Sequence, residues 1–476
     1  MSEKTTVSLS NKVSTSAFWI FLFQIMDNVL GFVRLLILAR LLSPSDFGLV
    51  AIAWLVLQTI GAFTQTGIHQ TLIHKPNVEK YLDTAWTFLL VRGFILYGLV
   101  YIASPYLGSF FNNASAVDII KAVSFTMVLD GFVNIGVVLF QKNLTFNKQF
   151  IFQLSANFID FVVALTMAFI LKNVWALVLG GLANSVARIV LSYILSEYRP
   201  KFAFNYGAFK EMNNYGKWIA GSNILQFIYS QGDDLLVGKV LGSNSLGLYQ
   251  LAYRISNLPA TQITHIISAV LFPAYSQIQN DVRRLSNIYI RVFQFITFLS
   301  FFVGTVIICF ANDFTLLFLG EKWLPMVPTM KLLTIWGILR SMAATTGPVW
   351  QAIGKPHIMT RIQFIQVVIL LIIIYPLTSF YGIIGTSISI TLSAIFPYTV
   401  AFIYIGNTLS IKHSQLLQYI LYPFFNSILL ALFYLLIKKI FNDTNLINFI
   451  FMSVAVSFLY LLNTYLFSKY TPYKFL

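Results

Sequence analysis

Charged side chains interrupt apolar segments that are long enough to cross a membrane. The acidic ones are Asp27, Asp130, Asp160, Asp233 and Asp234, and the basic ones are Arg34, Arg92, Arg188, Arg254 and Arg340. A charge at the bilayer centre costs at least about 2.5–3.5 kcal/mol, so such residues usually face a bundle interior or a water-filled cavity. Two kinds of chemistry are open to them. They could bind a polar cargo in a hydrated cavity, or they could pair with one another between helices.

Polar residues recur at helical spacing around these charges. Gln24, Asp27, Gly31 and Arg34 follow one another at steps of three or four residues, which places them on one helix face. A shift of 199 gives a second stripe of Asn223, Gln226, Ser230 and Asp233. Further polar rows are Gln250, Arg254 and Asn257; Gln153, Asn157 and Asp160; and Asn184 with Arg188. We therefore expect a hydrated central chamber with walls from the helices near 16–40, 47–68, 216–240 and 248–272.

The composition is that of an integral membrane protein. Of 476 residues, 58% are hydrophobic and only 10% are charged, and the mean hydropathy is +0.77. Soluble domains carry about 25% charged residues. The net charge of +15 fits basic cytoplasmic loops better than a nucleic-acid partner.

Fourteen segments have the length and apolarity of membrane spans, which need about 20 residues. They centre on 16–40, 47–68, 84–107, 117–140, 151–171, 174–196, 216–240, 248–272, 286–310, 327–352, 358–378, 382–405, 415–438 and 446–467. With both termini in the cytoplasm, more than twice as many Lys and Arg fall in cytoplasmic as in exported segments. This asymmetry predicts cytoplasmic termini.

Two gapless matches indicate an internal repeat. "ARLLSPSDFGLV" (39–50) aligns with "GKVLGSNSLGLY" (238–249) at a shift of 199, and "KAVSFTMVLD" (121–130) aligns with "KLLTIWGILR" (331–340) at a shift of 210. Six spans is an even number, so the two copies have the same orientation, as in parallel-repeat transporters. The expected fold is therefore all-α: two parallel six-helix lobes around a central cavity, at 1–200 and 201–408, with two additional spans at 409–476.

Catalytic and metal-binding patterns are missing from the sequence. There is no G-x-S-x-G, no H-E-x-x-H and no long loop that could form a soluble catalytic domain. The single cysteine, Cys309, excludes a disulfide framework, and the five histidines lack ligand spacing. We expect a protein that is not an enzyme and needs no cofactor or metal.

Several motifs, in order, resemble the polysaccharide transporter (Wzx-type) family of the multidrug/oligosaccharidyl-lipid/polysaccharide exporter superfamily. They are "LARLLSPSDFGLVAIA", "GIHQTLIHKP", "VLFPAYSQIQND", "LFLGEKWLPMVPTMKLL" and "GILRSM". The resemblance runs from about residue 10 to 405 and weakens in the last two spans. It implies two lobes in a V, alternating access and a plasma-membrane (inner-membrane) location.

The cargo implied by this resemblance is an undecaprenyl-diphosphate-linked oligosaccharide repeat unit. It would be flipped for capsule, exopolysaccharide, teichuronic-acid-like or O-antigen assembly, with a basic cavity for the head group and spans 13 and 14 near the lipid tail. Arginine is well shaped to bind phosphate, and the candidates are Arg34, Arg254, Arg340, Arg92 and Arg188. Candidates for other cavity contacts or ion coupling are Gln24, Asp27, Asp130, Asp160, Asn223, Gln226, Asp233 and Asn257.

Other functions remain open at this stage. A lipid II flippase is hard to separate by sequence, whereas a cation-drug exporter of the same superfamily fits the five intramembrane arginines less well. A membrane scaffold would not need polar stripes in both lobes. Expected partners are the lipid-linked substrate, membrane lipid, and a polymerase and chain-length regulator of the same pathway, with no nucleic acid.

Overall fold

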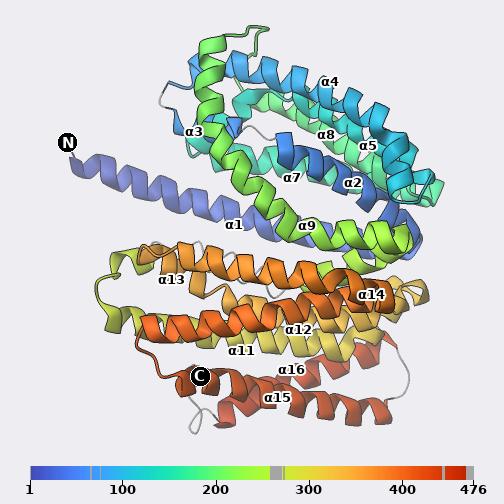
Figure 1. Cartoon of the computed structure of the whole chain (residues 1–476), viewed down its shortest axis with the longest axis vertical. Coiled ribbons are helices and arrows are strands. Elements are labelled where there is room, and N and C mark those ends of the chain that lie inside the picture. The colour runs from blue at the N-terminus through green and yellow to red at the C-terminus, as the bar shows by residue number, and fades with distance from the viewer. Residues whose placement is uncertain are drawn as a thin grey trace. The chain divides into compact units, whose positions relative to one another are not determined.

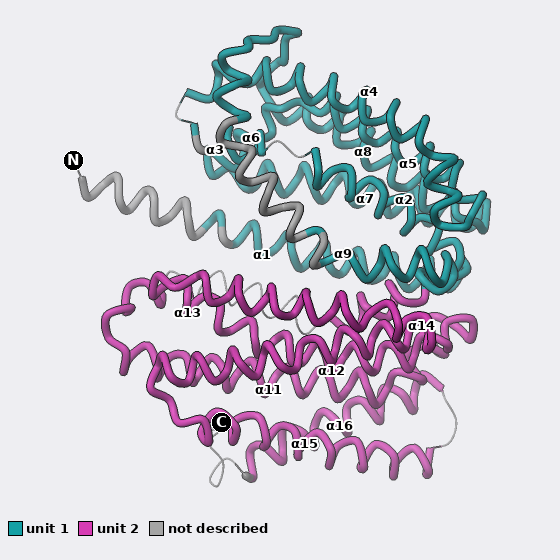
Figure 2. The backbone as a smooth tube through the Cα atoms, in the orientation of Figure 1, with its two compact units in different colours: residues 1–247 teal, residues 248–476 magenta. Residues whose placement is uncertain are grey.

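The computed structural model describes the backbone of residues 2–64, 67–75, 77–257, 271, 274–441 and 445–467. Within these ranges, the side chains of 2–14, 17, 74, 214–226, 228, 229 and 467 lie outside the description. Every regular element in the described ranges is a helix, as the composition predicts (Figure 1). The chain forms two compact units, residues 1–247 and 248–476 (Figure 2).

The first unit holds the helices that carry most of the polar stripes. Its elements are α1 (Ser2–Leu41), α2 (Pro44–Thr64), α3 (Ile68–His74), α4 (Glu79–Phe110), α5 (Ser115–Phe132), η1 (Ile135–Val137), α6 (Val138–Lys142), α7 (Phe146–Leu171), α8 (Trp175–Leu195) and most of α9 (Tyr206–Ser256). Helix α7 packs against both α1 and α8, and α5 packs against α2, α4 and α8. The pair α1 and α7 therefore positions the stripe that contains Arg34.

Small residues let α1, α7 and α8 approach closely. Leu38 and Leu42 of α1 and its following turn are buried against Ala164, Ala168 and Ala176. Small side chains are typical of helix interfaces in membranes, where close backbone packing replaces the hydrophobic driving force.

The polar S-P-S-D motif starts a helix. Ser43 and Asp46 form a reciprocal cap: the Ser43 backbone N–H donates to Asp46 at 2.9 Å, and the Asp46 N–H donates to the Ser43 hydroxyl at 3.2 Å. Pro44 occupies the first helical position, where a missing N–H costs nothing. The motif therefore fixes where α2 begins and how tightly it follows α1.

The second unit holds α11 (Val282–Phe314), η3 (Thr315–Leu319), η4 (Glu321–Met326), α12 (Val327–Ala343), α13 (Thr346–Ala352), α14 (His357–Thr408), α15 (His413–Ile440) and α16 (Leu446–Phe467). Helix α12 packs between α11 and α14, and α15 and α16 pack on α11. The expected additional spans 13 and 14 correspond to α15 and α16.

Two long helices are interrupted at glycines. In α14, Gly382 has φ +60°, the Thr378 and Thr386 hydroxyls lie 2.9 Å apart, and Ser389 donates to the carbonyl of Ile373 at 3.4 Å. In α9, Gly242 has φ +81°. Glycine adopts positive φ without the steric cost that other residues incur. Each of these elements therefore consists of two helical arms.

Nine helical segments of the described chain are long and apolar enough to cross a membrane, or ten if one bent pair counts as a span. The chain is thus a multi-pass membrane protein. The bent pair is α5 with residues 135–142, which meet at 74°. The predicted span over 117–140 is bent at this point, because Asn134 leaves the helix and its side chain accepts a hydrogen bond from the Gly136 N–H.

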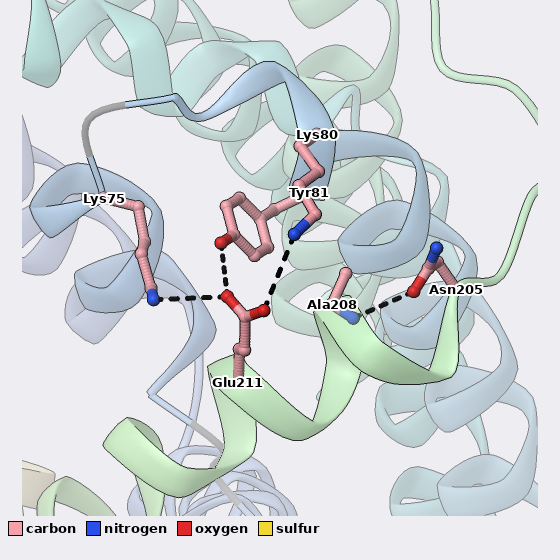
Figure 3. Close-up of polar contacts among 6 residues, drawn as sticks. All are labelled: Lys75, Lys80, Tyr81, Asn205, Ala208 and Glu211. Atoms are coloured by element: carbon pink, nitrogen blue, oxygen red, sulfur yellow. Dashed lines mark hydrogen bonds and ion pairs between the residues drawn. The ribbon is translucent and has the colours of Figure 1, made fainter.

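An ionic cluster joins the start of α9 to Lys75 and to the start of α4 (Figure 3). Glu211 accepts a hydrogen bond from Tyr81 at 2.5 Å and lies 3.4 Å from Lys75 and 3.5 Å from Lys80. The Asn205 side chain caps the same helix by accepting from the Ala208 N–H at 3.0 Å. The Tyr81 hydrogen bond, followed by the charge of Lys80, lowers the pKa of Glu211.

Candidate functional site

Arg34 of α1 forms a bidentate ion pair with Asp160 of α7. Its two terminal nitrogens each lie 2.8 Å from one carboxylate oxygen. The two side chains are 27% and 14% exposed, so the pair is mostly shielded. The Arg34 Nε is buried and has no hydrogen-bond partner in the described part of the chain. Parallel fork-to-fork contacts are the strongest and most directional form of this interaction.

A glycine on α8 makes room for the Asp160 carboxylate. A Cβ atom at position 180 would lie 2.5 Å from Asp160 Oδ1 and 2.7 Å from the Ala164 Cβ. Any larger residue at Gly180 would therefore push on the carboxylate that holds Arg34. The sequence alone does not indicate Gly180, because its contact with Asp160 arises only when α8 packs on α7.

A second polar group continues along the same helices. Asn157 of α7 donates to Asp27 of α1 at 2.6 Å, and Asn184 of α8 donates to Asn157 at 3.0 Å. Gln24 and Asp27 also line a cavity of 360 Å³ between α1 and α7. The stripe predicted on α1 is thus directed toward α7, and Asn157 and Asn184 extend it across three helices.

Arg188 and Arg92 have separate partners. Arg188 of α8 lies 3.2 Å from Asp130 of α5, and both side chains are about two-fifths to one-half exposed, at 40% and 47%. Arg92 of α4 donates to the Thr64 hydroxyl of α2 at 2.7 Å. In the described part of residues 1–247, the three candidate arginines therefore occupy three polar groups and not one.

In the second unit, two candidates meet each other. Arg340 of α12 lies 3.5 Å from both the Asn257 side-chain oxygen and the Tyr253 hydroxyl, and its guanidinium lies 5.0 Å from the centre of the Trp336 ring. Asn257 is buried. Arg254, in the last turn of α9, is exposed.

The structure describes only part of the second polar stripe, which aligns with the first at a shift of 199. Asp233 of α9 is 7% exposed, hence buried. Asn223 and Gln226 belong to the part of α9 whose side chains lie outside the described residues.

The sequence-repeat turns contact each other. A Cβ at Gly48 would overlap the carbonyl of Ser243, and a Cβ at Gly247 would overlap the carbonyl of Pro44. Pro44 and Ser243, like Gly48 and Gly247, are equivalent at the shift of 199. The contact is therefore reciprocal between the two aligned segments.

One buried charge escaped the sequence prediction. Asp313 of α11 is 1% exposed, forms an ion pair with Lys438 of α15 and accepts a hydrogen bond from Tyr434 at 2.7 Å. Lys438, the last residue of the predicted span 415–438, lies in the last turn of α15. The position of Asp313 at the end of an apolar run was the signal that could have identified it.

Comparison with known proteins identifies relatives in polysaccharide assembly. The sequence profile of the family described as "Polysaccharide biosynthesis protein" matches residues 37–328. The lipopolysaccharide biosynthesis protein WzxC of Escherichia coli (strain K12) is 26% identical over 355 residues, covering 74% of this chain and 72% of WzxC. The teichuronic acid biosynthesis protein TuaB of Bacillus subtilis (strain 168) is 22% identical over 351 residues, covering 73% of each chain.

The fold is shared with a solved transporter. The lipid II flippase MurJ, in an inward closed conformation, superposes with a TM-score of 0.72 at 15% identity, covering 94% of this chain and 99% of MurJ. At this identity the likeness establishes the fold alone.

Proposed function

Since this chain belongs to the polysaccharide biosynthesis protein family, we propose that it is a flippase for undecaprenyl-diphosphate-linked oligosaccharide repeat units. By alternating access, it moves them across the plasma membrane for capsule, exopolysaccharide, teichuronic-acid-like or O-antigen assembly. The names of its relatives WzxC and TuaB assign those proteins to lipopolysaccharide and teichuronic acid biosynthesis, which supports a role in polysaccharide assembly. The sugars and the diphosphate cannot cross hydrocarbon unaided, whereas the lipid tail can remain in the bilayer.

The bidentate pair of Arg34 and Asp160 is the observation that carries the mechanism. Arg34 lies inside a candidate span, 18–41, where an unneeded charge would be costly. A diphosphate offers more charge and more acceptor oxygens than one carboxylate, so it can replace Asp160 as the partner of the guanidinium. We propose that Arg34 is held by Asp160 when the cavity is empty and turns to the diphosphate when the cargo enters. The unpartnered Arg34 Nε supports a further acceptor in the loaded state.

The other candidates take supporting roles in this proposal. Arg92, Arg188, Arg254 and Arg340 add positive potential along the path of the head group. Asp27, Asp130, Asp160 and Asp233 exchange arginine partners or carry a coupled ion, and Gln24, Asn223, Gln226 and Asn257 contribute neutral polar contacts. The direct contacts of Arg188 with Asp130 and of Arg340 with Asn257 support an exchange of partners.

We also propose fourteen spans, divided into an N-lobe (1–200), a C-lobe (201–408) and two additional spans (409–476). A straight helix of 52 residues would be about 78 Å long, whereas the hydrocarbon core is about 30 Å thick. The helix breaks at Gly242 and Gly382 therefore support two spans each in α9 and α14. The reciprocal contact at Gly48 and Gly247 supports two equivalent repeats.

In this scheme both termini are cytoplasmic, and the protein moves its cargo without breaking a covalent bond. A polymerase and a chain-length regulator of the same pathway would act on the exported repeat units.

Deletion of the gene tests the cargo. The proposal predicts that undecaprenyl-diphosphate-linked repeat units accumulate in the deletion strain and return to the wild-type level on complementation. Accumulation of lipid II instead would identify the protein as a lipid II flippase, the function that the name of MurJ gives for that neighbour. An unchanged pool of both lipids would overturn the proposal.

A further inference from the structure

A polar and aromatic cleft between α1 and α7 lies apart from the arginines. Its volume is 360 Å³, within the range of about 300–1,000 Å³ that small-molecule sites occupy. Trp19, Gln24 and Asp27 line it from α1, and Gln149, Phe150 and Gln153 line it from α7. The cleft is thus built by two helices of the same unit that pack directly against each other.

The lining excludes an anionic ligand. None of the described residues that line this cleft is basic, and Asp27 contributes a carboxylate that already accepts from Asn157 at 2.6 Å. A diphosphate here would meet like charge without a compensating cation. A ligand that donates hydrogen bonds and carries no negative charge suits the cleft better.

The side chains match the two faces of a sugar ring. A pyranose has apolar C–H faces and a rim of hydroxyl groups. The rings of Trp19 and Phe150, 5.1 Å apart and tilted by 56°, offer an apolar wall. The amides of Gln24, Gln149 and Gln153 each offer both donors and an acceptor, which can engage hydroxyl groups in either direction.

Gln149, which lines the cleft, carries a buried acceptor. The Gln149 Oε1 atom is buried and has no hydrogen-bond partner among the described residues. Buried polar atoms are nearly always paired, so an exception calls for an explanation such as an absent ligand. A sugar hydroxyl is a donor of the required kind.

The order of groups along α1 and α7 matches the order within the cargo. The two helices run parallel, because Trp19 meets Phe150, Asp27 meets Asn157 and Arg34 meets Asp160 in succession. Asp27 and Arg34 are seven residues apart, which is about 10 Å along a helix. A ligand whose diphosphate reaches Arg34 would therefore place its attached sugars toward Asp27 and the cleft.

We propose that the cleft lined by Trp19, Gln24, Asp27, Gln149, Phe150 and Gln153 is the saccharide subsite, which binds uncharged sugar residues of the cargo. This inference rests on the proposed function, because it takes the cargo to be a lipid-linked oligosaccharide. It assigns sugar recognition to α1 and α7 and separates it from recognition of the diphosphate by Arg34.

The test uses the full-length protein in lipid nanodiscs and the oligosaccharide released by mild acid from lipid extracts of the deletion strain. Isothermal titration gives the Kd for the wild type and for the variants Gln149→Leu/Gln153→Leu and Trp19→Leu. The matched control is Asn147→Leu, an amide on an exposed face of α7 outside the cleft. Thermal unfolding of each variant verifies that it is folded.

The expected result is a Kd at least about tenfold higher for both cleft variants, the loss of roughly 1.4 kcal/mol of binding. Asn147→Leu should bind as the wild type does, and Arg34→Gln should bind the phosphate-free oligosaccharide within about twofold of the wild type. Equal affinity in the wild type and the folded cleft variants, or no saturable binding to the wild type, would overturn the subsite. Failure of the proposed function is a separate result, because the lipid-linked oligosaccharide would then not accumulate in the deletion strain.

Discussion

Gly48 and Gly247 occupy equivalent positions of the sequence repeat, and each packs against the backbone of the other's turn. Gly48 meets Ser243, and Gly247 meets Pro44, the residue equivalent to Ser243. Ser243 also accepts a hydrogen bond from Asn113 at 3.0 Å. The start of α2 and the turn at Gly242 therefore pack backbone against backbone.

Substitution of Gly48 should destabilise the protein, because a side chain there would displace the backbone of Ser243. We expect Gly48→Ala to cost about 1–3 kcal/mol, the usual range for overpacking. A Cβ added at Gly61, in the same helix, would meet no atom within 4 Å, so Gly61→Ala should be neutral or stabilising by roughly 0.5–1 kcal/mol. Thermal unfolding in detergent compares the two, and an equal fall in Tm would contradict the packing role.

The Glu211 cluster should make the start of α9 sensitive to acid. The Tyr81 hydrogen bond and the charges of Lys80 and Lys75 lower the pKa of Glu211 below its ordinary value of 4.5. A group with a lowered folded-state pKa stabilises the fold above its unfolded-state pKa, and this contribution is lost as the pH falls through the folded-state value.

Hydrogen exchange over residues 206–213 measures this effect. After correction for intrinsic rates, protection in the wild type should fall as the pH is lowered below about 4.5. In Glu211→Gln, protection should be lower at pH 7 and should change less with pH. Parallel pH profiles in the two proteins would show that Glu211 does not fasten this segment.

The buried pair of Asp313 and Lys438 should fasten α15 to α11. Breaking a buried ion pair on one side costs about 3–5 kcal/mol, and we expect Asp313→Asn to fall below this range because Lys438 is 32% exposed. The double variant Asp313→Asn/Lys438→Met should recover part of the loss, which a double-mutant cycle quantifies. Lys439→Met, at an exposed neighbour, is the control. Additive losses would mean that the two residues do not interact.

Local sequence patterns predicted much of the fold. Apolar length predicted a multi-pass helical protein, which the helices of the described chain confirm. The equivalence of residues 39–50 and 238–249 stays a prediction of the gapless match at a shift of 199. The bend after α5 was not predicted, because the apolar pattern continues through it. Its cause is local capping by Asn134, an interaction that hydropathy does not register.

The sequence predicted which polar residues share a helix face, but not which of them pair. Helical spacing placed Asp27 and Arg34 on one face of α1, and this face does meet α7. That Arg34 pairs with Asp160 depends on the parallel alignment of α1 and α7 and on the space left by Gly180. These are properties of tertiary packing between segments more than a hundred residues apart, which a single sequence does not specify.

A charge swap tests the central claim, that Arg34 serves the cargo and not only Asp160. The measurement is the pool of undecaprenyl-diphosphate-linked repeat units in the deletion strain carrying wild-type protein or Arg34→Asp/Asp160→Arg. The swap keeps an ion pair between α1 and α7 but moves the cation to the other helix. The account predicts a low pool with the wild type and a pool near that of the deletion strain with the folded swap variant. A swap variant that lowers the pool as well as the wild type does would contradict it, because the pair would then have a structural role only.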